Sequence, residues 1–142
     1  MNQEDLAKDY LKQADIRFET AKRVINENMY AYAIRQSQEA VELALKGAMR
    51  LIGVDFPKWH DIGETLRKEK DKFPENFLKD IPKLSAISEK LLALREPAMY
   101  GDENLNLGPS DLFNKSDTRE VLNDTEFCLK KVKNLFETFK KR

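Results

Sequence analysis

Segment 31–53 constrains the fold most, because small residues line one side of its helical pattern. The small line consists of Ala33, Ser37, Ala40, Ala44 and Ala48. Small side chains let another helix axis approach closely, which large residues at every contact would prevent. Larger apolar residues widen this stripe, and charged residues (Arg35, Glu39, Glu42, Lys46 and Arg50) take much of the other side. We therefore predict a central helix, packed between two longer ones and ended by Gly53.

The preceding segment predicts a first amphipathic helix. Residues 3–28 repeat apolar residues at helical spacing after an acidic start at Glu4 and Asp5, which suits the helix dipole. The connection at 28–30 is so short that this helix and the central one are expected to lie antiparallel.

Shorter pieces are predicted after the central helix. A third helix starts at His60 or Asp61 and runs to about residue 70, and Pro74 and Pro82 bracket a short helical turn at 75–80. A fourth helix begins at Pro82, because proline is favoured in the first turn.

Pro97 is expected to disturb that fourth helix. It disfavours helical geometry at Glu96 and lacks a backbone N–H, so the helix should kink or stop near Arg95. A long polar loop, 101–116, follows. Asp117 or Thr118 is then predicted to cap a last helix that runs to the C-terminus. The predicted fold class is all-α: an up-and-down bundle of four main helices with short additional helical segments, in one domain, 1–142.

Composition excludes several classes of protein. Lysine plus arginine and aspartate plus glutamate both number 25, which argues against a strongly basic nucleic-acid binder. The one cysteine, Cys128, lies on an apolar stripe and is expected to be a buried thiol in a reducing compartment. The polar start and the lack of a long apolar run predict a cytoplasmic protein with no membrane partner.

Most catalytic templates are absent from the sequence. It has no glycine-rich phosphate loop, no metal-spaced Cys or His cluster and no Ser-His-Asp signature, so neither a metal nor a cofactor is expected. The single histidine, His60, either has a structural role, in which it hydrogen-bonds backbone groups at a helix start or packs on Trp59, or acts as an acid–base group, since imidazole titrates near pH ~6.5.

Segment 94–102, LREPAMYGD, is the other candidate site. Arg95 borders the apolar face of its helix, and a nearly buried arginine needs a carboxylate, phosphate or carbonyl partner. Tyr100 and Asp102 follow where helix and loop side chains can converge. The alternative is a salt bridge that holds the loop to the bundle.

These residues together resemble a known family. The run YAIRQSQEAVELALKGAMRLIG, followed by WHDIGETL, is similar to the second and third helices of the HEPN domain, a prokaryotic helical bundle often encoded beside a minimal nucleotidyltransferase. The family carries an arginine followed four to six residues later by a histidine near the start of a loop. Here Arg95 is present, and Tyr100, followed by Gly101 and Asp102, stands in the histidine's place.

The resemblance implies a homodimer in which two arginine motifs face a shared cleft. It assigns Arg95 and Tyr100 to the catalytic positions, and it implies a binding site formed by Arg95, Glu96, Tyr100, Asp102 and His60. Many members are metal-independent ribonuclease toxins, but a tyrosine, with a pKa near ~10, is a poor base at neutral pH. Glu96 places an acidic group beside Arg95.

Three functions stay open from the sequence. The favoured one is a weakly active or inactive HEPN partner of a nucleotidyltransferase, in a toxin–antitoxin-like pair, that binds RNA or nucleotide. The second is an active metal-independent endoribonuclease toxin that uses Arg95 with Tyr100 or His60. The third is a purely structural interaction module with Arg95 in a salt bridge.

Overall fold

The computed structural model describes residues 2–55 and 61–140. Within these ranges the chain is helical without a named strand, and the one bridge of strand type joins Asp102 to Leu107. The predicted all-α class is therefore confirmed. The helices are α1 (Gln3–Val24), α2 (Tyr30–Leu51), α3 (Ile62–Lys68), α4 (Glu75–Leu78), α5 (Ile81–Tyr100), α6 (Pro109–Leu112) and α7 (Lys115–Lys140).

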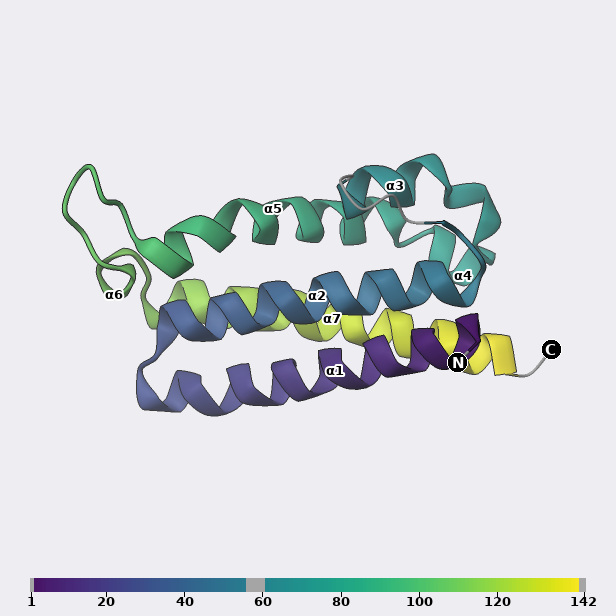
Figure 1. The fold of residues 1–142 in the computed structure, drawn as a ribbon, viewed down its shortest axis with the longest axis horizontal. Helices are drawn as coiled ribbons and strands as arrows, with labels where there is room; N and C mark the ends of the chain where they lie inside the picture. The colour runs from purple at the N-terminus through teal and green to yellow at the C-terminus, as the bar shows by residue number, and fades with distance from the viewer. Residues whose placement is uncertain (1, 56–60, 141–142) are drawn as a thin grey trace.

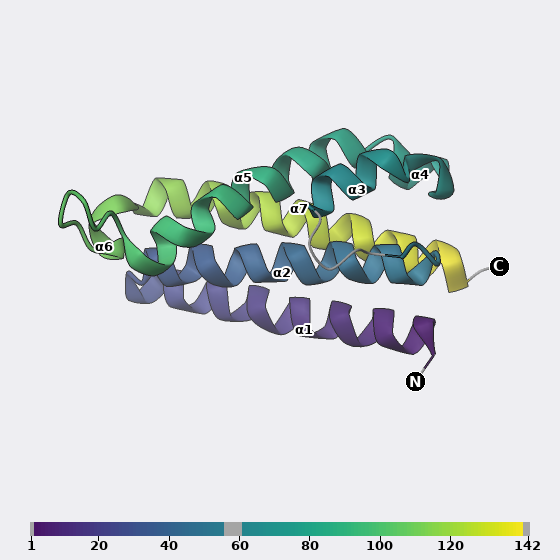
Figure 2. The same ribbon diagram turned by 45° about the horizontal axis from the view of Figure 1, so that its top comes forward.

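Four long helices form the body of the molecule. α1, α2, α5 and α7 lie roughly antiparallel in chain order, up and down along the long axis (Figure 1). α3 and α4 lie at the end that carries both termini, and α6 lies at the opposite end (Figure 2). Among the described residues, no helix combines the length and the apolar character that crossing a bilayer would require.

The small line of α2 is in the core, as predicted. Its five members from Ala33 to Ala48 are all completely buried. Gly47 extends the close approach, because a Cβ there would lie 3.1 Å from the carbonyl oxygen of Ala7 in α1. The sequence predicted two long neighbours for α2, but three pack against it: α1, α5 and α7. Small residues on adjacent sides of α2 allow three long helices to pack against it.

Most helix boundaries match the predicted ones because their signals are local. Asn28 takes a left-handed φ of 62° after a 3-10 turn, Ile25–Glu27, and reverses the chain between α1 and α2. Asp61 caps α3, where its Oδ1 accepts the Gly63 N–H at 2.8 Å.

The sequence predicted that α5 would kink or stop near Arg95, and of these two alternatives the stop is wrong. The helix continues to Tyr100 and holds Pro97 inside it. Pro97 removes a single hydrogen bond, while its own carbonyl accepts the Gly101 N–H at 2.8 Å and Ala98 is buried against the bundle. Burial of Ala98 and the Gly101 hydrogen bond therefore outweigh the missing donor.

The predicted start of the last helix is also wrong, by a few residues. α7 begins at Lys115 because Asn114 caps it: its Oδ1 accepts the Asp117 N–H at 2.8 Å, and the Asp117 carboxylate accepts the Asn114 N–H at 3.3 Å. This reciprocal pair has the spacing of a capping box. Asp117 is thus the second member of the box and not the cap itself.

Candidate functional site

Arg95 lies on the exposed side of the C-terminal part of α5. Leu92 and Met99, about one turn before and one turn after it, are 42% and 43% exposed. This spacing places the three side chains on one face of the helix. The sequence predicted a nearly buried Arg95, which is wrong, because Leu91 and Ala98 occupy the buried face.

Arg95 makes no hydrogen bond or ion pair with any residue in 2–55 or 61–140. The predicted alternative, a salt bridge that ties the following loop to the bundle, is therefore not formed within these ranges. The charged guanidinium group is exposed to solvent, where an anion from outside the protein can bind it.

Three predicted binding residues meet in one pocket, and Arg95 does not line it. Glu96, Tyr100 and Asp102 border a pocket of about 390 Å³ between the end of α5, the turn that follows it and α6. Glu103 adds a third carboxylate, and no lysine or arginine among the described residues lines this pocket. The carboxylates would repel a phosphate placed there.

Asp102 stabilises the turn that closes this pocket, which we call the acidic pocket. Asp102 and Leu107 exchange two backbone hydrogen bonds of 2.9 Å, and Asp102 Oδ1 accepts the Leu105 N–H at 3.1 Å. Gly101 permits the entry to this turn with a φ of 73°, and a Cβ there would lie 2.2 Å from the Leu107 carbonyl oxygen. The observed role of Asp102 is therefore structural.

His60 lies outside the described residues, so its place in the site stays a prediction. Tyr100, the residue in the family's histidine position, is 56% exposed at the end of α5. The structure thus separates the predicted site into an exposed cation at Arg95 and an acidic pocket beside Tyr100.

Sequence analysis missed a second pocket, which we call the α2 pocket. It has a volume of about 530 Å³ and lies where α2 begins, beside the end of α5 and the start of α6. Tyr30, Tyr32 and Arg35 line its α2 side, and Ala98 and Ser110 line the other. Arg35 and Glu39 are spaced as on any charged outer face, so the sequence carries little signal of a pocket.

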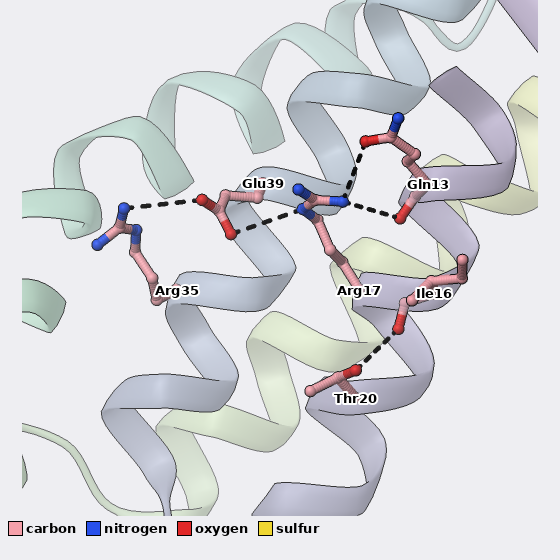
Figure 3. A network of polar contacts seen from close by, with 6 residues as sticks. All are labelled: Gln13, Ile16, Arg17, Thr20, Arg35 and Glu39. Carbon is pink, nitrogen blue, oxygen red and sulfur yellow. Dashed lines mark hydrogen bonds and ion pairs between the residues drawn. The ribbon is translucent and has the colours of Figure 1, made fainter. Parts of the chain in front are cut away.

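Arg35 belongs to a short chain of charges that joins α2 to α1. Its Nη2 lies 3.6 Å from Glu39 Oε1, and Arg17 Nε of α1 lies 3.7 Å from Glu39 Oε2 (Figure 3). Arg17 also donates hydrogen bonds of 3.4 Å to the backbone and side-chain oxygens of Gln13. One carboxylate therefore serves two guanidinium groups, and the three charges sum to +1.

Among the residues that the structure describes, the clear pKa shifts lie away from both pockets. A hydrogen bond from Lys90 of α5 lowers the pKa of the Glu120 carboxyl on α7, and the same bond raises the pKa of Lys90. Cys128 is buried, which confirms the predicted buried thiol, and this burial raises the pKa of its thiol. The residues described include no cluster of His, Cys, Asp or Glu side chains that could hold a metal ion.

Comparisons with known proteins agree with this fold. The sequence model of the HEPN domain matches residues 7–141. A protein of Methanocaldococcus jannaschii named "Putative toxin MJ1304" is 31% identical over 137 residues, which cover 92% of this chain and 88% of that protein.

Two solved structures are similar along nearly their whole length. The crystal structure of TT1696 from Thermus thermophilus has a TM-score of 0.68 and 25% identity, and covers 94% of this chain and 98% of its own. ST0689, described as an archaeal HEPN homologue, has a TM-score of 0.63 at 24% identity and covers 90% of this chain and 95% of its own, which indicates a shared fold.

Proposed function

The chain belongs to the HEPN domain family, and from this premise we propose that residues 1–142 act as one RNA- or nucleotide-binding domain. In this proposal the domain works with a nucleotidyltransferase in a toxin–antitoxin-like pair and cleaves RNA weakly or not at all. The archaeal relative whose name contains "toxin" supports the toxin-like role. The observation that carries the proposal is the exposed Arg95, which has no ion pair within residues 2–55 and 61–140.

Arg95 suits the binding of an RNA phosphate. An exposed guanidinium without an internal partner gives up no ion pair when it binds an anion, and it can offer two parallel N–H groups to a phosphate.

The surroundings of Tyr100 support weak or absent cleavage. Glu96, Asp102 and Glu103 line the pocket beside it, and their charges oppose the approach of a phosphate to the tyrosine hydroxyl. Arg95 is the cation nearest to this pocket in sequence, but it does not line it. The arrangement favours an anion held at Arg95 over one held between Arg95 and Tyr100.

We also propose a homodimer through this face of α5. Leu92 and Met99 expose large apolar surfaces on either side of Arg95, and exposed apolar residues that lie together favour a protein interface. A second copy would bring a second Arg95 to the same face and so double the positive charge that RNA meets.

The binding proposal is tested with labelled single-stranded RNA in a fluorescence polarisation titration. Arg95→Gln should weaken binding by about tenfold and lower the salt dependence by about one phosphate contact, because one cation is removed. Arg23→Gln, at an exposed arginine of α1, is the matched control and should leave binding within about twofold.

Cleavage is measured in the same samples with a metal chelator present. We expect little or no cleavage by the natural sequence, and Tyr100→His should increase it, because imidazole titrates near neutral pH. Rapid cleavage that Tyr100→Phe abolishes would establish the active ribonuclease instead. If neither the natural sequence nor any variant binds RNA, the third function, a purely structural interaction module, would be supported instead.

A further inference from the structure

Arg35 is a largely buried cation that makes no hydrogen bond within residues 2–55 and 61–140. Its side chain is 19% exposed, and its Nε is buried without a hydrogen-bond partner. Its ion pair with Glu39 spans 3.6 Å, which is longer than a charge-assisted hydrogen bond. A guanidinium withdrawn from water without replacement of its hydrogen bonds is costly, so this site favours an anion that supplies acceptors.

The two terminal nitrogens of Arg35 are the groups that an anion can reach. Of the three guanidinium nitrogens, only Nε is buried without a partner. Arg35 lines the α2 pocket, so an anion in that pocket can accept hydrogen bonds from the terminal nitrogens. A planar carboxylate matches the parallel N–H groups of a guanidinium.

The surrounding charges favour a ligand with a single negative charge. Arg35, Glu39 and Arg17 form the chain of charges in Figure 3, and their sum is +1. Arg35 and Glu39 are the charged residues among the described residues that line the pocket. A monoanion brings this sum to zero, whereas a dianion would leave a net negative charge beside the Glu39 carboxylate. A carboxylate therefore suits the site better than a phosphate monoester.

Aromatic and apolar groups form much of the remaining wall. Tyr30 and Tyr32 provide rings from α2, and Ala98 and Pro109 provide apolar contacts from α5 and α6. The Tyr30 hydroxyl donates a hydrogen bond of 2.9 Å to Asn28 Oδ1, which holds its ring in place. Tyr32 is 42% exposed, so part of its side chain is open to a ligand. The volume of about 530 Å³ and this lining are typical of a small-molecule site.

We propose that the α2 pocket binds a small aromatic carboxylate, with the carboxylate on the terminal nitrogens of Arg35 and the ring against Tyr32. Such a ligand would contact α2, α5 and α6 together, because each of these helices contributes to the wall. Arg95 does not line the α2 pocket, so the inference does not rest on the RNA-binding proposal.

Isothermal titration calorimetry at neutral pH tests the ligand class with defined probes. 2-Naphthoate should bind at least about tenfold more tightly than 2-naphthamide, which lacks the charge, or acetate, which lacks the ring. It should also bind more tightly than 2-naphthyl phosphate, which is mostly a dianion because its second pKa is near ~6. Equal or tighter binding of the naphthyl phosphate would overturn the carboxylate assignment.

Substitutions test the roles of the two charges in the pocket. Arg35→Gln should weaken 2-naphthoate binding at least about tenfold, because the carboxylate loses its charged partner. Arg17→Gln is the matched control: Arg17 also pairs with Glu39 but does not line the pocket, so binding should stay within about threefold. Glu39→Gln should increase the affinity for 2-naphthyl phosphate more than that for 2-naphthoate, because it removes the carboxylate that repels a dianion.

Two further variants locate the ligand. Tyr32→Ala changes an exposed residue, where folding is little affected, and should weaken 2-naphthoate binding several-fold, whereas Arg95→Gln should leave it unchanged. Thermal unfolding of each variant without ligand confirms that it is folded. Equal affinity of the natural sequence and Arg35→Gln, an equal loss in Arg95→Gln, or no binding of 2-naphthoate at millimolar concentration would overturn the proposal. RNA binding could then still be present at Arg95, so the two proposals fail separately.

Discussion

The two ends of the bundle differ in how completely they bury their apolar residues. At the end that carries the termini, the small residues of α2 lie against α1, and Ala40, Ala44 and Ala48 are completely buried. The other end, where α2 begins and α5 ends, contains both pockets of the candidate sites. Among the described residues, nearly all large apolar side chains that are at least 37% exposed lie in this half: Met29, Tyr32, Leu92, Met99, Tyr100, Leu105 and Leu107.

This difference shows how one helix can serve both stability and binding. The C-terminal half of α2 presents small residues to neighbours that leave no space, while its N-terminal part presents Tyr32 and Arg35 to an open pocket. We call the end that carries the termini the closed end, and the end where α2 begins and α5 ends the open end. The closed end is expected to determine the stability of the fold, and the open end is expected to tolerate substitutions that alter binding. Substitutions at matched residues test this division.

The largest effect is expected in the closed end. Ala44→Leu adds a bulky side chain where none of the alanine surface is exposed, and overpacking should lower the free energy of unfolding by about 3 kcal/mol. Ala93→Leu, at an exposed alanine of α5, is the control and should change it by less than about 0.5 kcal/mol. Urea denaturation measures both, and equal stabilities would refute close packing around Ala44.

Two glycines with positive φ compare the ends directly. Gly101→Ala at the open end should cost about 2 kcal/mol, because the residue has a φ of 73° and its new Cβ would meet the Leu107 carbonyl oxygen. Gly53→Ala at the closed end has a φ of 82° but open space, so only backbone strain of about 1 kcal/mol is expected. A larger loss at Gly53 than at Gly101, measured by urea denaturation, would contradict this order.

Much of the closed end could be predicted from the sequence because its signals are local and periodic. The line of small residues predicted the buried face of α2, and Asp61 predicted the start of α3. The errors at Pro97 and Asn114 have one cause. Local preferences at each residue were outweighed by contacts that the sequence pattern does not display: burial of Ala98 in one case and a reciprocal cap in the other.

The open end was harder to predict because its sites combine distant segments. The motif at 95–102 predicted a site at Arg95, but the exposure of Arg95 depends on which residues of α5 face the core. Arg35 had the spacing of an ordinary surface charge, and its burial results from the approach of α5 and α6 to the start of α2. A pocket between three helices leaves no periodic signal in any one of them.

The smallest effect on folding, and a specific effect on association, is expected at the exposed face of α5. The double variant Leu92→Gln/Met99→Gln replaces two side chains that are more than 40% exposed, so the stability of a single protomer should change by less than about 1 kcal/mol. If a second copy covers this face, loss of two apolar contacts should raise the dimer dissociation constant at least about tenfold. Sedimentation equilibrium across micromolar concentrations measures that constant.

Ile16→Gln is the control for that experiment, because Ile16 is 60% exposed on α1 and lies outside the proposed interface. It removes a comparable apolar surface and should leave association unchanged. A dimer weakened equally by both changes would place the interface elsewhere, and a monomer at all concentrations would refute the homodimer. Loss of dimer in the α5 variant alone, with RNA affinity reduced in parallel, would instead link the exposed apolar residues to function. RNA binding would then depend on the dimer, in which two copies of Arg95 share one surface.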